Sequence, residues 1–297
     1  FSSTTSLMSE KMNKQTYFFF IKHLIFVIIS LLFLILISIQ KKEFLVKYLP
    51  FLFLISILLL LLVPLAGVDV KGSKRWLDLP FFPRFQPIEL VKPLFIIFIA
   101  KIITQSENQN IYKRYLYSFF ISAFIIILLI YQPDLGQSIL LATTWITMIF
   151  VSGFNMILLL ILGLVFLFIF AFLIINFPEK FGYIFLRIKT FIDPQKGDNF
   201  QSQKALDAIK EGGLTGRGMG EGILKDKVPE AHTDYIISVI SEEFGVIIVL
   251  LIMIIFLTLS YNILKKIKYE NDDKVKLILV GIASIILFQT FIHIGVN

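Results

Sequence analysis

Cysteine is absent from this 297-residue sequence, which excludes disulfide bonds, thiolate nucleophiles and cysteine-ligated metals. Charged residues are also scarce, at 16% of the chain, whereas apolar residues make up 57% and Phe alone occurs 32 times. Together with a mean hydropathy of +0.84, this composition indicates an integral membrane protein. The net charge of +7 does not indicate a nucleic-acid partner, because Lys and Arg near span ends usually record membrane orientation.

The sequence also lacks an initiator Met, internal repeats and low-complexity linkers. It begins at Phe1 without a signal-peptide pattern and ends at Asn297 inside an apolar segment. We therefore expect a fragment of a longer protein, with a single membrane domain over residues 1–297.

Long apolar segments dominate the chain. A membrane-spanning helix needs roughly 20 mostly apolar residues, and eight segments approach that length, which predicts an all-α, polytopic helix bundle. These segments lie near 17–39, 44–66, 88–104, 115–131, 135–151, 155–176, 235–260 and 275–297.

Basic residues in three short connections predict the orientation. Lys and Arg concentrate near 40–47, 105–114 and 261–276, and the positive-inside tendency makes that side cytoplasmic. The opposite side then carries the polar motifs described below, including one long extracytoplasmic loop over 177–234.

Three cations flank an aromatic residue on the predicted outer side, in the stretch from Lys71 to Trp76. Lys74 and Arg75 suit a phosphate or pyrophosphate, and Trp76 suits the headgroup layer. A generic contact with lipid headgroups explains this stretch equally well.

Polar residues also enter the apolar segments. Glu89 and Lys92 are three residues apart, so they share a helix face and can pair. Ionisable groups inside a span usually face a cavity or a partner, although structural pairing alone remains an alternative. Gln132, Asp134 and Gln137 form a second polar cluster, which ordinary turn chemistry also explains.

The long loop contains two recognisable segments. Apolar residues at helical spacing over 200–210 predict a short amphipathic helix on the bilayer surface. Six glycines around Arg217 follow; without a preceding strand they do not indicate a dinucleotide site. Their backbone N–H groups could approach an anion or act as a hinge, and a plain loop is the alternative.

Asp234 is the last charged residue before the apolar segment that begins at Tyr235. A carboxylate at this boundary, close in sequence to Glu230 and His232, is a candidate general base. The alternative is an ordinary helix start, with Thr233 or Asp234 as the N-cap.

Taken together, these motifs resemble the FtsW/RodA group of SEDS (shape, elongation, division and sporulation) proteins. The resemblance covers nearly the whole chain in order. The motifs are Lys71-Gly72-Ser73-Lys74-Arg75-Trp76, Gln86-Pro87-Ile88-Glu89-Leu90-Val91-Lys92, Gln132-Pro133-Asp134-Leu135-Gly136, Gly216-Arg217-Gly218-Met219-Gly220, Pro229-Glu230-Ala231-His232-Thr233-Asp234, Glu242-Glu243-Phe244-Gly245 and Ile294-Gly295-Val296-Asn297.

Within the group, the stretch from Gly197 to Gly222 resembles the division-type branch, FtsW, more than the elongation-type branch, RodA. The resemblance implies about ten spans in the whole protein, with one missing before Phe1 and at least one after Asn297. Ile88 departs from the Ser that the group usually has there, and the group's C-terminal Gly-Gly-Ser motif is absent.

The resemblance implies a peptidoglycan glycosyltransferase that polymerises lipid II at the outer face of the bacterial cytoplasmic membrane, at the septum if the chain is of the division type. It implies Asp234 as the general base and Mg²⁺ to screen the pyrophosphate. It also implies a class B penicillin-binding protein, divisome proteins and membrane lipids as partners. The implied substrate-contacting or cavity residues are Lys74, Arg75, Trp76, Gln86, Glu89, Lys92, Asp134, Arg217, Glu230 and His232.

Two other functions remain open from the residues alone. A flippase for the lipid-linked precursor also needs a hydrated, basic cavity, and a scaffold for a division partner needs no chemistry. Neutralising Asp234 discriminates the polymerase from these two alternatives, because only the polymerase requires a base.

Overall fold

The computed structural model describes residues 17–70, 73–78, 84–105, 110–178, 182, 200–224, 228 and 235–296. The chain divides into two compact units. The first unit comprises Phe1–Val46, Pro194–Leu257 and Thr290–Asn297, and the second comprises Lys47–Asp193 and Thr258–Gln289. A single membrane domain over 1–297 stays a prediction.

Helices account for most of the described chain, as the apolar segments predict, and each predicted segment coincides with at least one helix. The helices are α2 (Phe18–Ser38), α3 (Lys42–Ala66), α4 (Pro87–Thr104), α5 (Ile111–Tyr131), α6 (Leu135–Val151), α7 (Met156–Asn176), α9 (Phe200–Gly212), α10 (Ile236–Phe244), α11 (Val246–Lys266) and α12 (Asp273–Val296), with a short 3-10 turn η2 (Ile267–Tyr269).

Several of these helices can cross a membrane, so the chain is a multi-pass membrane protein. α4 carries three charges, on Glu89, Lys92 and Lys101, and α6 has only 17 residues, so the count of eight spans stays a prediction. Five helical segments in the described ranges are long and apolar enough: Phe18–Ser38, Val46–Ala66, Ile111–Tyr131, Val246–Tyr269 and Asp273–Gly295.

The prediction of one continuous span over 235–260 is wrong. The chain breaks at Gly245, whose φ of 81° cannot continue a right-handed helix. The break leaves α10 with nine residues and starts the long apolar helix α11 at Val246. A side chain at residue 245 would collide with the backbone carbonyl of Leu214, only 2.1 Å from an ideal Cβ, so the glycine also permits close backbone packing.

A two-stranded antiparallel sheet, which the all-α prediction missed, connects α3 to α4. Strand β1 (Val68–Val70) pairs with β2 (Ser73–Trp76), with Val68 opposite Trp76. An isolated bridge between Leu77 and Phe85 returns the chain to the start of α4.

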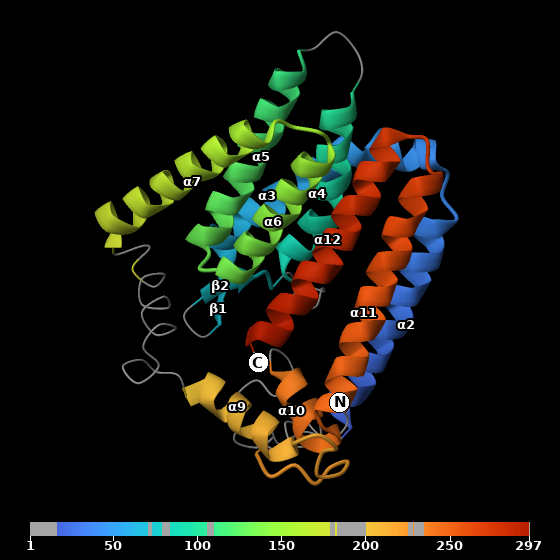
Figure 1. Ribbon diagram of the computed structural model, residues 1–297, viewed down its shortest axis with the longest axis vertical. Helices are drawn as coiled ribbons and strands as arrows, with labels where there is room; N and C mark the ends of the chain where they lie inside the picture. Colours follow the sequence, from blue (N-terminus) through green and yellow to red (C-terminus); the bar gives the residue numbers. More distant parts are fainter. Residues whose placement is uncertain are drawn as a thin grey trace. The chain divides into compact units, whose positions relative to one another are not determined.

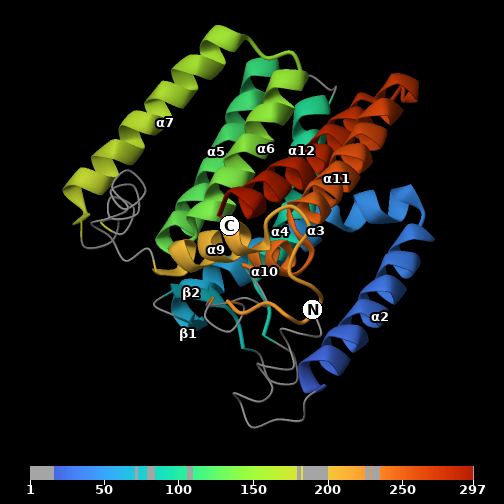
Figure 2. The same cartoon turned by 60° about the horizontal axis from the view of Figure 1, so that its bottom comes forward.

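The core of the second unit lies among α4, α5 and α6, which run side by side in Figures 1 and 2. Phe95, Leu129 and Leu141 are completely buried there. α12 approaches α4 closely at Gly281, where an ideal Cβ would lie 2.5 Å from a side-chain carbon of Ile96. This close approach brings the polar residues of α12 next to those of α4.

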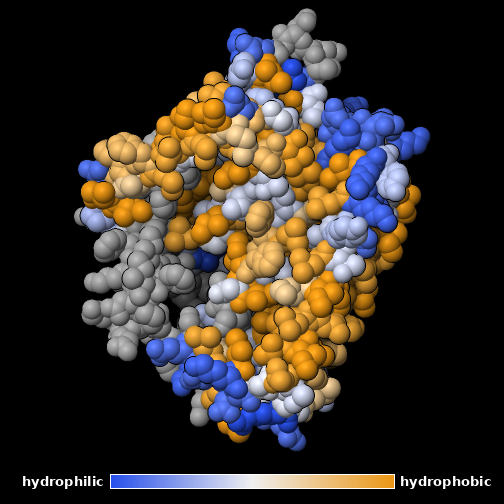
Figure 3. Space-filling view, viewed as in Figure 1, coloured by the Kyte–Doolittle hydropathy of each residue, from blue (hydrophilic) through white to orange (hydrophobic). Residues whose placement is uncertain are grey.

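The exposed faces of the long apolar helices are mostly apolar. Figure 3 shows hydrophobic side chains along the helices and hydrophilic ones at their ends, as at the connection between α11 and α12. Leu34 is 63% exposed and Leu160 is 67% exposed. Faces of this kind would be unfavourable in water and suit contact with lipid hydrocarbon.

Candidate active site

The predicted base and its two sequence neighbours, Asp234, Glu230 and His232, lie outside the described residues. The described residues that bracket them are Leu224 and Tyr235. The roles of all three therefore stay predictions.

Strand β2 separates the cations that the sequence places together. Successive side chains of a strand point to opposite faces, and exposure alternates along Ser73–Trp76 accordingly. Lys74 and Trp76 lie on the exposed face, and Arg75 lies on the more buried one. Only Lys74 and Trp76 therefore face outward together.

Arg75 is directed at the turn that precedes α6. Its guanidinium donates to the backbone carbonyl of Pro133 and lies 3.8 Å from Asp134 Oδ1. Asp134 is 5% exposed. The arginine is thus engaged by protein groups, and any phosphate it binds must share it with Asp134.

Asp134 is a point of connection between three elements. Its Oδ1 accepts from the Gln137 backbone N–H and caps α6, as an Asp N-cap typically does. Its Oδ2 accepts from Gln86 Nε2 at 2.9 Å, and Gln86 is the N-cap residue of α4. Asp134 therefore joins the starts of α4 and α6 to Arg75 of the sheet.

The predicted pairing of Glu89 with Lys92 is confirmed, with 2.7 Å between Lys92 Nζ and Glu89 Oε2. The Lys92 side chain is 5% exposed and that of Glu89 53%. Lys92 also donates to Gln289 Oε1 on α12 at 3.4 Å, and Gln137 Nε2 donates to Glu89 Oε1 at 3.4 Å. The buried ammonium is thus held by Glu89 of its own helix and by Gln289 of α12, and the partly exposed carboxylate of Glu89 also contacts α6 through Gln137.

These two networks place positive charge at one end of the helices. The N-termini of α4 and α6, which carry the positive ends of their helix dipoles, meet through Gln86 and Asp134. Arg75, Lys92 and the exposed Lys74 add three cations, of which Asp134 and Glu89 offset two. This arrangement favours an anionic group at the N-terminal ends of these helices.

A cavity of about 670 Å³ opens beside these residues, between the sheet and the start of α4. It combines an aromatic wall, a carboxylate and an amide with apolar side chains, a lining that suits an amphipathic ligand. The lining residues are Trp76, Phe85, Gln86, Glu89, Leu90 and Pro93.

Arg217 lies in the first unit, where its guanidinium pairs with Glu211. The hypothesis that the surrounding glycine-rich segment offers N–H groups to an anion is wrong for three of them. The N–H groups of Gly216, Arg217 and Gly218 donate instead to backbone carbonyls, those of Gly212, Glu242 and Glu243. The segment is a turn whose backbone is held by α10, and the side chain of Arg217 folds back onto Glu211.

The helix predicted over 200–210 is confirmed as α9, whereas its location on the bilayer surface stays a prediction. Its fully buried residues are Ala205 and Ala208, which belong to an apolar cluster with Val239 of α10. One face of α9 is therefore covered by protein.

Sequence reasoning missed Gln289 altogether, and it named Glu242 only as part of a motif, without its contact. Gln289 contacts Lys92, and its signal was available as a lone amide in the apolar stretch from Ile285 to Phe291. Glu242 is completely buried, and its position beside the glycine-rich segment depends on a contact between residues 18 positions apart, which no local pattern reveals.

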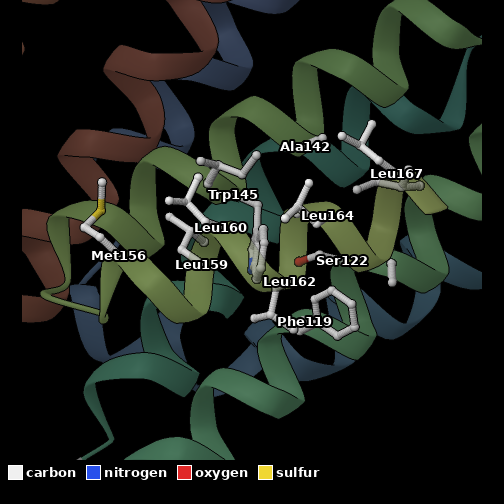
Figure 4. A pocket seen from close by; sticks show the side chains of 14 residues that line it. Phe119, Ser122, Ala142, Trp145, Met156, Leu159, Leu160, Leu162, Leu164 and Leu167 are labelled. Atoms are coloured by element: carbon white, nitrogen blue, oxygen red, sulfur yellow. The ribbon is translucent and has the colours of Figure 1, made fainter. Parts of the chain in front are cut away.

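A second cavity, of about 420 Å³, lies among α5, α6 and α7 (Figure 4). Phe119, Trp145 and Leu160 line it, and Ser122 is one of its few polar side chains. This lining suits a hydrocarbon chain and offers little to a sugar or phosphate.

A metal site is not evident in the described part of the chain. No three His, Cys, Asp or Glu side chains there lie close enough together to hold an ion. The described residues therefore do not by themselves form a resident Mg²⁺ site.

Comparison with known proteins decides the family. The model of the cell cycle proteins FtsW, RodA and SpoVE matches residues 1–297. The chain belongs to this family. Among curated relatives, it is 33% identical over 259 residues to a probable peptidoglycan glycosyltransferase FtsW of Haemophilus influenzae, covering 82% of this chain and 63% of the relative.

Other relatives include both division and sporulation proteins. A probable peptidoglycan glycosyltransferase FtsW of Coxiella burnetii is 31% identical, covering 100% of this chain and 81% of the relative. The stage V sporulation protein E of Bacillus subtilis is 34% identical, covering 81% of this chain and 66% of that protein. The chain thus spans only part of each relative.

Solved structures support the fold of this family member. A chain from a structure titled for the coordination of polymerization and crosslinking by a peptidoglycan synthase complex matches with a TM-score of 0.69 at 24% identity, covering 90% of this chain and 75% of that one. Rod shape determining protein RodA of Thermus thermophilus matches with a TM-score of 0.59 at 24% identity, covering 90% of this chain and 71% of that one. At this identity the likeness shows the fold alone.

Proposed function

We propose that the full-length protein is a peptidoglycan glycosyltransferase that polymerises lipid II into glycan strands. The observation that carries this proposal is the whole-chain family match, joined by relatives that are named probable peptidoglycan glycosyltransferases at 30–33% identity. The positive helix ends beside an amphipathic cavity support it, because the substrate combines a lipid, a pyrophosphate and a sugar.

The reaction is a direct displacement at a sugar carbon. The GlcNAc 4-hydroxyl of one lipid-linked disaccharide attacks the MurNAc C1 of another. The new β-1,4 bond forms with inversion, and undecaprenyl pyrophosphate leaves. Such a displacement needs a base on the attacking hydroxyl and charge stabilisation of the leaving group, but no covalent nucleophile.

Asp234 is the proposed base, since it is the carboxylate at the boundary of an apolar segment in the motif that resembles the family's. Glu230 and His232 would tune or position it. These assignments rest on the resemblance.

Preorganised positive charge would stabilise the negative charge that develops on the leaving pyrophosphate. Lys92 is already desolvated and held by Glu89 and Gln289, so it needs little rearrangement to act on a developing negative charge. Lys74 is exposed and available to a ligand at the surface. Arg75 contributes through its shared contact with Asp134, and Trp76 and Gln86 would line the path of the substrate.

Mg²⁺ is proposed to act with the substrate. Mg²⁺ in phosphate-handling sites is usually held in large part by oxygens of the substrate's phosphates, so the pyrophosphate oxygens would supply ligands. The ion's contribution is to screen the charge of that group.

We further propose location in the cytoplasmic membrane, at the septum, with a class B penicillin-binding protein and divisome proteins as partners. The match to a chain of a peptidoglycan synthase complex supports assembly with a crosslinking enzyme. The FtsW names of the relatives favour the division role over a RodA-type elongation role, although a sporulation protein is equally similar.

The test uses purified full-length protein with its cognate transpeptidase, labelled lipid II and Mg²⁺, with products resolved by size. We expect a glycan ladder from the parent and none from Asp234→Ala. A ladder that survives in the folded variant removes Asp234 as the base while keeping the activity. No ladder from a folded, partner-bound parent favours a flippase or a scaffold instead.

A further inference from the structure

Glu242 is a buried carboxylate that the proposed reaction does not use. It lies on α10 and is 0% exposed. Its Oε1 accepts a hydrogen bond of 2.7 Å from the backbone N–H of Leu224. A carboxylate is costly to bury, and a charge-assisted hydrogen bond of this length is among the stronger compensations available.

The backbone around Glu242 holds the glycine-rich segment as well. The N–H of Arg217 donates to the Glu242 carbonyl at 2.9 Å, and that of Gly218 donates to the Glu243 carbonyl at 3.0 Å. These carbonyls belong to the last turn of α10, where helical acceptors lack partners within their own helix. The segment therefore serves as the C-terminal cap of α10.

Glycine is required for this contact. An ideal Cβ on Gly216 would lie 2.3 Å from the Glu243 carbonyl oxygen, and one on Gly222 would lie 2.9 Å from Glu242 Oε2. Any side chain at residue 216 would push the segment away from α10. At residue 222, even a methyl group must displace the carboxylate of Glu242.

The residues that follow this contact between the glycine-rich segment and α10 include the proposed base, Asp234. Ten residues, 225–234, separate Leu224 from Tyr235, and α10 begins at Ile236. Val228, inside that stretch, is buried with Tyr235 and Val239 in one apolar cluster. Residues 225–234 therefore follow Leu224, which Glu242 of α10 holds, and they lead directly to the start of the same helix.

We propose that Glu242 is a positioning residue for glycosyl transfer, acting through the Leu224 N–H to hold the entry of the stretch that carries Asp234. This role rests on the proposed function of Asp234. The chemistry needs an oxygen acceptor at this point and not a negative charge, so Gln is expected to replace Glu, and Leu is not. A misplacement of about 1 Å can slow an enzyme about a hundredfold, so loosening this contact acts mainly on kcat.

The experiment compares Glu242→Leu, Glu242→Gln and Gly222→Ala in the full-length protein. Hydrogen exchange is followed in peptides covering residues 213–224, and kcat and KM are measured for lipid II. Glu221→Leu is the matched control, because Glu221 is an exposed carboxylate of the same segment. We expect faster exchange and a kcat lowered about tenfold or more in Glu242→Leu and Gly222→Ala, with KM little changed. The Gln and Glu221 variants should behave like the parent.

Two results overturn the proposal. One is a parent-like kcat in a folded Glu242→Leu variant, and the other is a Gln variant as impaired as the Leu variant. If Glu242→Leu does not fold, Gly222→Ala decides, because it keeps the carboxylate and only displaces it. The exchange result does not depend on activity. The experiments therefore distinguish the two proposals: Asp234→Ala tests Asp234 as the base, and hydrogen exchange in the Glu242 variants tests the contact between Glu242 and Leu224.

Discussion

The side-chain amide of Gln132 donates to the backbone carbonyl of Leu60 at 2.9 Å, in the interior of the second unit. Leu60 lies four residues before Pro64, which is inside α3 and has no N–H to offer that carbonyl. Gln132 is 4% exposed. Gln132, in the connection between α5 and α6, therefore supplies the hydrogen bond that α3 lacks because of Pro64.

Replacing Gln132 with Leu should destabilise the protein by about 1–3 kcal/mol, because a buried carbonyl loses its donor. Thermal unfolding in detergent measures the change. Pro64→Ala is the matched background, since residue 64 then supplies an N–H and the cost of Gln132→Leu should shrink. An equal cost in both backgrounds would show that the two residues are not coupled through Leu60.

Asp134→Ala should also lower the unfolding temperature. The loss of an N-cap costs about 1 kcal/mol, and Gln86 and Arg75 lose an acceptor as well. Asp78→Ala is the control, because its ion pair with Arg84 is exposed and such pairs contribute about 0–1 kcal/mol. Equal shifts in the two variants would contradict a connecting role for Asp134.

Lys92→Met should lower kcat of lipid II polymerisation by about tenfold or more, since a preorganised positive charge is removed from the site. Lys101→Met, on the same helix α4 but not part of the network, serves as the control and should keep parent activity. Initial rates at saturating lipid II make the comparison. Unchanged turnover in a folded Lys92 variant would remove Lys92 from the reaction.

Lys74→Ala should raise KM for lipid II while leaving stability unchanged, because Lys74 is on the exposed face of β2. Its effect should diminish as salt screens the exposed charge. Arg75→Ala, one residue away, should lower the unfolding temperature instead, since Arg75 holds the turn before α6. If both variants behave alike, the alternation of the strand does not separate their roles.

Chelation of Mg²⁺ by EDTA should slow polymerisation without shifting the unfolding temperature. The reason is that the proposed ligands are substrate oxygens, so the ion would bind together with lipid II and contribute little to the stability of the free protein. Parallel rate and melting measurements test this, and a large thermal shift on chelation would instead indicate an ion bound by the protein.

The membrane class, the approximate limits of most helices and the family were predictable from the sequence. These follow from local properties. Apolar length decides which segments can enter a bilayer, and the ordered motifs from Lys71 to Asn297 carry the resemblance. The pairing of Glu89 with Lys92 was also predictable, because helix geometry places residues three apart on one face.

The tertiary structure alone decided which polar residues are committed to one another. The engagement of Arg75 by Asp134, of Lys92 by Gln289 and of Leu224 by Glu242 joins residues 18 to 197 positions apart. The separation of Arg75 from Lys74 and Trp76 depends on strand β2, which pairs with β1. Such contacts form because buried polar groups must find partners, and which partner is within reach depends on how the helices pack.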